Sequence, residues 1–271
     1  MIFVCPKCKG KFNISSDSRV AKCESGHSYD KSRFGYYNLL LGNSGGTHGD
    51  NKEMVLARRE FLSRGFYHPL ALRVAETCEA VVSRSSKILD VGCGEGYYTS
   101  VIREKCKEKA TNIAVFDISK DAVREAAKKK CADEYAVASA YHMPVGDESI
   151  DLIVNTFSPL AREEVYRSLK RGGHFIMAIP AEEHLFGLKS AIYDTPYKNE
   201  VADTALDGFS LLSREELKYT LNLDTDADIR ALFMMTPYAY RTSAAGRERV
   251  LSLKQIKTDA HFLILTYRKD F

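Results

Sequence analysis

The segment from Ile88 to Tyr98 constrains the fold of this chain more than any other stretch. It reads Ile-Leu-Asp-Val-Gly-Cys-Gly-Glu-Gly-Tyr-Tyr, a short apolar run with one carboxylate, followed by alternating glycines. The apolar start is typical of a buried parallel strand. Gly92, Gly94 and Gly96 predict a sharp turn whose backbone adopts positive φ and approaches a ligand closely. Because the next helix begins with free amide groups, we predict a strand, a cofactor-binding loop and a helix, in that order.

The spacing of the glycines and a later carboxylate indicate which kind of cofactor the loop binds. A glycine-rich turn alone also occurs in ordinary strand-to-helix connections. The spacing is G-x-G-x-G and not the G-x-G-x-x-G dinucleotide fingerprint. Asp117 ends the next apolar run, Ile113–Phe116, where a ribose-binding carboxylate is expected. The run resembles motif I of class I S-adenosylmethionine-dependent methyltransferases. This resemblance implies that Asp90 lies near the amino-acid part of the cofactor, that the glycines face it, and that Asp117 holds the ribose hydroxyls.

From Lys87 onward, strand and helix patterns alternate. The expected strands are 87–91, 112–117, 134–138, 150–155 and 174–179, and the expected helices are 96–108, 119–130 and 160–169. Such alternation predicts a doubly wound α/β sheet of parallel strands, which binds ligands at the carboxyl ends of its strands. Residues 208–222 and 260–268 are expected to form a closing antiparallel pair around a helical segment at 226–239, an arrangement typical of class I methyltransferases.

The carboxyl edge of this sheet would collect further candidate cofactor contacts. Ser139 stands where class I methyltransferases often carry an Asp that contacts the adenine. Asn155-Thr-Phe-Ser-Pro159 stands where many exocyclic-amine methyltransferases carry Asn/Asp-Pro-Pro-Tyr, which argues against an amino group as the target. His184 follows the last parallel strand, although a lone loop histidine is more often solvated. The candidates at this edge are Asp90, Gly92, Gly94, Glu95, Gly96, Asp117, Ser139, Asn155 and His184.

Two pairs of metal-ligand residues lie near the N-terminus. Cys5-Pro-Lys-Cys8 is followed fourteen residues later by Cys23-Glu-Ser-Gly-His27, which gives C-x₂-C and C-x₃-H. This spacing predicts a tetrahedral zinc site, and so few apolar residues lie around it that the module would need metal to fold. Scattered reduced cysteines are the alternative. The remaining cysteines, Cys78, Cys93, Cys106 and Cys131, are interpreted as small packing residues.

Composition and charge set the cellular context. The seven cysteines are an odd number for a disulfide framework, and no apolar run is long enough to span a membrane, so we expect a cytoplasmic protein without membrane contact. Residues 1–60 hold ten Lys/Arg against six Asp/Glu, a charge of +4, whereas the rest holds 29 against 30, a charge of −1. The N-terminal excess gives mild support to a polyanionic partner.

The chain is expected to divide into three segments. Residues 1–37 would form the zinc-binding domain, residues 38–86 a linker and helices, and residues 87–271 the methyltransferase domain. The glycine-rich stretch 42–49 is interpreted as a linker or flap. A helix capped by Asp50 or Asn51 would follow it and carry Arg58 and Arg59, as a solvated face or as phosphate contacts.

Taken together, these motifs resemble the bacterial RlmA family of 23S rRNA guanine-N1-methyltransferases. The resemblance rests on the metal-ligand pattern and on Gly35–Leu40, Arg58–Leu62, Gly65–Leu70, Asp90–Tyr98, His184–Lys189 and Met235–Pro237. It implies that Cys5, Cys8, Cys23 and His27 bind zinc, and that Tyr67, Gly94, Glu95 and His184 contact S-adenosylmethionine. It further implies a 23S rRNA hairpin loop as the partner, a homodimer, and, in the Gram-positive subgroup, an effect on macrolide sensitivity.

The implied reaction places a methyl group on guanine N1, which carries a proton at neutral pH. The enzyme must therefore remove that proton or stabilise the anion. Asp194, Glu182 and Glu183 lie in a suitable segment, but no motif identifies any of them as the base. Because duplex RNA hides the Watson–Crick edge, the target base should be unpaired. Two alternatives remain open: a methyltransferase for a small molecule, and a zinc-dependent nucleic-acid-binding protein with a vestigial Rossmann domain.

Overall fold

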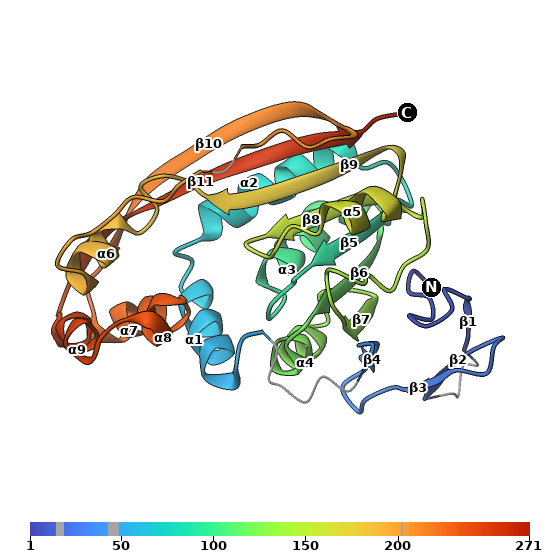
Figure 1. Ribbon diagram of the computed structural model, residues 1–271, viewed down its shortest axis with the longest axis horizontal. Helices are drawn as coiled ribbons and strands as arrows, with labels where there is room; N and C mark the ends of the chain where they lie inside the picture. The colour runs from blue at the N-terminus through green and yellow to red at the C-terminus, as the bar shows by residue number, and fades with distance from the viewer. Residues whose placement is uncertain (15–18, 43–48, 202) are drawn as a thin grey trace.

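A mixed eight-stranded sheet runs through the computed structural model, which describes residues 1–14, 19–42, 49–201 and 203–271. The strand order is β10-β11-β9-β8-β5-β6-β7-β4 (Figure 1). Neighbouring strands from β4 to β9 are parallel, whereas β11 is antiparallel to β9 and β10 is antiparallel to β11. The strands are β4 Tyr37–Asn38, β5 Lys87–Val91, β6 Asn112–Asp117, β7 Glu134–Val137, β8 Ile150–Thr156, β9 Leu169–Pro180, β10 Phe209–Leu223 and β11 Ile256–Lys269.

The predicted doubly wound class I methyltransferase sheet is confirmed. Strands β5 to β8 match the sequence-based ranges within a residue at each end, because each is a short apolar run. β9 begins at Leu169, five residues before the predicted start at 174, and Leu169 pairs with Ile150 of β8 across a register irregularity. The closing pair is also present, but β11 begins at Ile256 and is longer than predicted.

Helices lie on both faces of the sheet, but more of them pack on one face than on the other. They are α1 Lys52–Ser63, α2 His68–Val81, α3 Tyr97–Lys105, α4 Lys120–Lys129, α5 Arg162–Ser168, α6 Phe186–Ile192, α7 Asp226–Met234, α8 Tyr238–Arg241 and α9 Ala244–Ser252, with a 3₁₀ turn at Lys107–Lys109. Helices α1 to α4 and α7 contribute to one hydrophobic core with one face of the sheet. α6 and α9 were not predicted from the sequence.

Local sequence explains where α1 and α2 begin. The Asn51 side chain accepts a hydrogen bond from the Met54 amide and thereby caps the first turn of α1. Gly65 has a φ of +81° and ends that helical stretch. α2 begins at His68, with Pro69 in its first turn, where a proline costs no hydrogen bond.

The second face of the sheet is covered by α5 and by the N-terminal residues. Phe3, Cys5 and Tyr37 are buried in the same core as Leu89 of β5 and Val165 of α5. The backbone amides of residues 2 and 3 donate to the Glu134 carboxylate at 2.5 and 3.1 Å. The N-terminal segment is therefore packed against the parallel edge of the sheet, as its position beside β4 and β7 in Figure 1 shows.

The N-terminal module, residues 1–37, contains a small antiparallel sheet of β1 Phe12–Asn13, β2 Val20–Cys23 and β3 Ser28–Asp30. β4 follows it and pairs in parallel with β7, so it lies across the boundary expected after residue 37. Most of the expected linker, residues 43–48, lies outside the described residues. Within the described ranges, no helix is long and apolar enough to cross a membrane.

Candidate cofactor cavity and metal centre

A cavity of about 500 Å³ opens at the carboxyl ends of the parallel strands and is called the central cavity below. Its wall combines the loop after β5 with residues at the ends of β6, β7, β8 and β9, and with parts of α1 and the α7–α8 connection. Of the predicted cofactor contacts, those that line it are Tyr67, Gly92, Gly94, Glu95, Asp117, Ser139 and His184. Gly96, Asp90 and Asn155 lie behind this wall.

The glycine loop follows the path that its sequence predicts. Gly92, Gly94 and Gly96 have φ values of +73°, +56° and +81°. A side chain at Gly96 would come within 2.6 Å of the Cys131 Sγ atom, so this glycine permits close packing of the loop on α4. At Gly94 the nearest atom to an added Cβ would be 3.9 Å away, on Arg58. An added Cβ at Gly94 would meet only this side chain, in ordinary van der Waals contact, so a ligand in the cavity can approach the Gly94 backbone.

Asp117 lies at the end of β6 and holds the loop in place. One carboxylate oxygen accepts the Gly94 amide at 2.9 Å, and the other accepts the Ser119 amide at 2.7 Å. Burial raises the pKa of Asp117, although the two amide bonds oppose this shift. The carboxylate keeps free lone pairs toward the cavity, as a contact with ribose hydroxyls requires.

Asp90 lies beneath the loop and is almost fully buried. Its carboxylate accepts a 2.5 Å hydrogen bond from the Thr99 hydroxyl on α3. Burial raises the pKa of Asp90 to about 6, the Thr99 bond opposes the shift, and Asp117 adds to it. When ionised, Asp90 can attract a cationic ligand in the cavity. Its hydrogen bond with Thr99 also fixes the position of α3 relative to β5.

Several polar atoms of the cavity wall have no protein partner among the described residues. Glu95 forms an ion pair with Lys129 through one carboxylate oxygen, while its other oxygen, Oε1, is buried and unpaired. The hydroxyls of Tyr98, Thr156 and Ser158 are likewise buried without a partner. Because buried polar groups are normally hydrogen-bonded, this wall has bonding capacity for a polar ligand.

Ser139 and Asn155 take different positions. Ser139 lines the cavity, and its hydroxyl accepts the Tyr141 amide at 3.2 Å. Asn155 instead accepts the Ser158 amide at 3.1 Å and donates to the Pro159 carbonyl at 3.2 Å. It shapes the loop after β8 from behind, and its contact with the cofactor stays a prediction.

Tyr67 and His184 meet in the cavity wall although they are far apart in sequence. The Tyr67 hydroxyl lies 3.3 Å from Nε2 of His184, and Nδ1 of His184 accepts the His261 amide at 3.3 Å. The proton of the neutral ring is therefore assigned to Nε2, which donates to Tyr67. Burial, together with Lys189 and His261, lowers the pKa of His184 to about 3. The ring stays neutral at physiological pH, and the Tyr67 hydroxyl proton is free to bond a ligand.

Arg58 and Arg59 have different surroundings. Arg58 lines the cavity, contacts Asp50 at 2.5 Å and donates to the Met235 carbonyl at 3.1 Å, so it connects two segments of the wall. Among the described residues it is the sole Lys or Arg in that wall. Arg59 points to Glu125 at 2.9 Å and is half exposed.

The acids considered as a base lie outside the central cavity. Glu183 is paired with Lys198 and Lys218, which lower its pKa to about 2. Asp194 is 91% exposed and contacts Arg249. Glu182 borders a separate, smaller cavity.

Several residues of the cavity wall could not be singled out as site residues from the sequence. These are chiefly Tyr98, Thr156, Phe157, Ser158 and Tyr238. The sequence feature that could have identified Thr156, Phe157 and Ser158 was their position at the end of a predicted parallel strand, where side chains reach the ligand-binding edge of the sheet.

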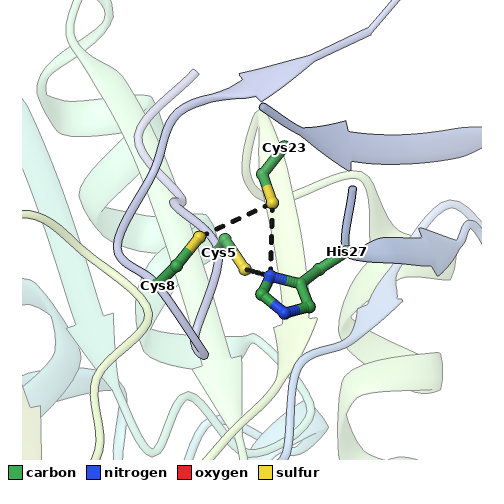
Figure 2. A group of neighbouring side chains, drawn as sticks. All are labelled: Cys5, Cys8, Cys23 and His27. Carbon is green, nitrogen blue, oxygen red and sulfur yellow. Dashed lines mark hydrogen bonds between the residues drawn. The ribbon is translucent and has the colours of Figure 1, made fainter. Parts of the chain in front are cut away.

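The metal centre lies in the N-terminal module (Figure 2). Its four ligand atoms all lie within 4.8 Å of one another. The Cys8 and Cys23 sulfurs are 3.5 Å apart, and the His27 Nδ1 atom lies 3.6 Å from the Cys5 sulfur and 3.4 Å from that of Cys23. Tetrahedral Zn²⁺, with bonds of about 2.0–2.3 Å, places its ligand atoms roughly 3.5–3.8 Å apart. The four residues therefore fit a closed structural zinc site, and the other four cysteines are free and buried.

Comparison with known proteins identifies the family. A profile described as a methyltransferase domain matches residues 89–177. The chain is 31% identical over 269 residues to YxjB of Bacillus subtilis, provisionally named a 23S rRNA (guanine-N1)-methyltransferase, covering 95% of this chain and 92% of that protein. It is also 31% identical to the 23S rRNA (guanine(748)-N(1))-methyltransferase of Streptomyces fradiae, covering 85% and 83%. The chain belongs to the 23S rRNA (guanine-N1)-methyltransferase family. The resemblance stated from its motifs is confirmed.

The central cavity fits S-adenosylmethionine, the cofactor of this methyltransferase family. The unpaired Glu95 oxygen suits an ammonium group, Asp117 suits a ribose diol, and Gly94 leaves room beside the backbone. The cavity is also large enough, since ligand pockets commonly measure roughly 300–1,000 Å³. Which wall residue contacts which cofactor atom stays a prediction.

Proposed function

We propose that this protein transfers a methyl group from S-adenosylmethionine to N1 of a guanine in an unpaired hairpin loop of 23S rRNA. The observation that carries the proposal is the extent of the similarity, which reaches 95% of the chain in a relative provisionally named for this reaction. The similarity therefore extends well beyond the matched methyltransferase domain at 89–177. The cavity and the metal cluster supply two sites that such an enzyme needs.

The wall residues would position the reactants. When bound, S-adenosylmethionine supplies a sulfonium methyl group, which N1 takes up as the carbon–sulfur bond breaks and the N1 proton leaves. Asp117 would hold the ribose, while the neutral His184 would keep the Tyr67 hydroxyl turned toward the cavity. Such alignment can supply a large part of the rate enhancement. The described cavity wall holds three carboxylates: Asp50, just before α1, Glu95, in the loop after β5, and Asp117, at the end of β6.

The N-terminal module would bind RNA. Its four metal ligands complete a tetrahedral shell and leave no position open for a substrate, so its metal serves structure and not chemistry. Residues 1–60 carry the chain's positive excess, which suits a phosphate backbone. We place the reaction in the cytoplasm, with a homodimer as the proposed assembly and macrolide sensitivity as a proposed consequence of the modification.

Two other functions have less support. A small-molecule methyltransferase would use the central cavity but would have no use for the metal cluster. A nucleic-acid-binding protein without activity would not need the buried, unpaired polar atoms of the cavity wall.

The decisive experiment follows the methyl group. The protein is incubated with labelled S-adenosylmethionine and unmodified 23S rRNA, and the RNA is digested and examined by mass spectrometry. The expected product is 1-methylguanosine from an unpaired loop. Methylation on N2, on ribose or on a pyrimidine would overturn the assignment, and label in a small molecule alone would favour the first alternative.

A further inference from the structure

Phe157 is held in a backbone conformation that aromatic residues rarely adopt. Its φ is +62°, in the left-handed region, where a side chain costs on the order of 1–2 kcal/mol. Its amide donates to the Ala178 carbonyl at 3.1 Å, and Asn155 braces the two residues that follow, Ser158 and Pro159. Strained residues that the surrounding structure holds in place cluster at functional sites.

The Phe157 ring is also unusually exposed for its surroundings. It is 39% exposed, although it lines the central cavity. Its inner side packs on Phe262, with ring centroids 5.5 Å apart, and the rings of Tyr98 and His184 lie at 6.2 and 6.4 Å. Neighbouring rings thus support one side of Phe157 while part of its surface stays open to a ligand.

The position of Phe157 separates it from two of the predicted cofactor contacts, Asp117 and Ser139, whereas two others, Tyr67 and His184, lie beside its ring with centroids 6.4 Å away. It follows β8, whereas Asp117 and Ser139 follow β6 and β7, and β5 with its glycine loop lies between the two groups. Of the other cavity aromatics in the described chain, only Tyr141 is similarly exposed, and it lies beyond β7 beside Ser139. Phe157 therefore lies at the end of the cavity where a methyl acceptor can meet the donor.

From this geometry we propose that Phe157 is the surface on which the target guanine stacks once it has turned out of the RNA loop. The inference rests on the proposed function and assigns the residue that holds the acceptor base. Aromatic side chains bind unpaired bases because every base has a π face. The Thr156 hydroxyl, one residue before Phe157, lines the same cavity and is buried without a partner, so it can bond a polar edge of the stacked base, whereas the Ser158 hydroxyl lies against Gly92 of the cofactor loop. The loop after β8 thus lacks the Pro-Pro-aromatic sequence of exocyclic-amine methyltransferases, but it presents the aromatic ring of Phe157 to the cavity.

The test compares variants of the full protein on an RNA hairpin that the wild-type enzyme methylates at guanine N1. Phe157→Leu keeps an apolar side chain and removes the π face, whereas Phe157→Tyr retains it. We expect kcat/KM for RNA to fall by about tenfold to a hundredfold in the leucine variant and to stay near the wild-type value in the tyrosine variant. Cofactor affinity, measured by calorimetry, should not change. Tyr240→Leu, at an exposed aromatic of α8 outside the cavity wall, is the matched control and should leave kcat/KM unchanged.

A structural role for Phe157 is separated by two further measurements. Phe157→Gly and Phe157→Ala lose the same ring packing, but only glycine relieves the left-handed strain, so the glycine variant should unfold at the higher temperature of the two while both lose methylation. A hairpin with 2-aminopurine at the target position should fluoresce more strongly with Phe157→Leu than with the wild-type enzyme, because the base is no longer stacked. Equal fluorescence and equal kcat/KM in the leucine variant would overturn the proposal, as would a glycine variant that methylates RNA much faster than the alanine variant, because activity would then follow stability. Failure of the wild-type enzyme to form 1-methylguanosine would instead overturn the proposed function.

Discussion

The metal centre and the central cavity are built in opposite ways. The metal centre takes its four ligands from residues 5–27, and its ligand atoms all lie within 4.8 Å of one another in a closed cluster. The cavity is lined by residues from 49 to 238, which the sheet and the helices bring together. One site is local and can be completed by an ion, whereas the other exists only in the folded domain.

The two sites also differ in how their polar groups are satisfied. The cluster is a full tetrahedral set, so an ion leaves nothing for a substrate to bind. The cavity wall keeps unpaired atoms on Glu95, Thr156 and Ser158, and burial raises the pKa values of Asp90 and Asp117 beneath and within it. A structural site closes on its ion, while a binding site leaves its bonding capacity for a ligand.

The largest effect is expected at the metal centre. Cys23→Ser removes one of four ligands, and because structural zinc contributes much of the folding free energy of such modules, RNA affinity should fall by about a hundredfold or more. Cofactor affinity should stay nearly intact. Zinc content, RNA binding and calorimetric cofactor titration measure the three properties, with Cys106→Ala, a buried cysteine outside the cluster, as the control. Equal loss of RNA and cofactor binding would show that the module is part of the catalytic fold.

A smaller effect is expected from the cavity's ribose-binding candidate. Asp117→Ala should weaken cofactor binding by about 2 kcal/mol, as expected for the loss of a charge-assisted hydrogen bond. Zinc content should not change, because Asp117 is not a member of the metal cluster. Asp121→Ala on α4, which pairs with Arg124 outside the cavity wall, is the control. An unchanged dissociation constant for Asp117→Ala would remove this residue from the site.

Arg58 and Arg59 are adjacent residues of α1 with different contacts, so they offer a matched pair of variants. Arg58→Gln breaks the connection between Asp50 and the Met235 carbonyl, so cofactor affinity should fall by about 1 kcal/mol. Arg59→Gln, which loses only its contact with Glu125, should leave cofactor affinity unchanged. Calorimetry on both variants tests this difference, and equal effects would contradict the role given to Arg58.

The smallest expected effect is a pH dependence of cofactor affinity. The pKa of Asp90 is raised to about 6, so the group is neutral below that pH and negative above it. A negative Asp90 attracts a cationic ligand, so affinity should increase by about threefold as pH rises through 6. Asp90→Asn should remove this dependence. Because the pKa of Asp90 is higher in the folded than in the unfolded protein, protonated Asp90 stabilises the folded state below pH 3.8, and this stabilisation is lost as pH rises through 6. The free energy of unfolding of Asp90→Asn should therefore exceed that of the wild type at neutral pH. A pH dependence that persists in Asp90→Asn would assign it to another group.

Local patterns were sufficient to predict the backbone framework. The glycine loop, the parallel strands β5 to β8 and the pairs of metal ligands each depend on residues close in sequence, so spacing and hydropathy identify them. The same argument explains the capping of α1 by Asn51. Even where element ends differed, as at β9 and β11, the type and order of the strands from β5 onward were predicted, whereas helices α6 and α9 were not.

The sequence by itself determined the metal-ligand set, the cofactor loop and the class of fold, because each depends on residues that lie close together along the chain. Tertiary structure decided which side chains face the cavity. Adjacent helix residues such as Arg58 and Arg59 point about 100° apart, and only the packing of α1 on the domain selects the inward one. Packing likewise brought Phe3 into the second core and placed Asn155 behind the wall while Phe157 faces into the cavity. These outcomes depend on contacts between distant segments, which no local pattern contains.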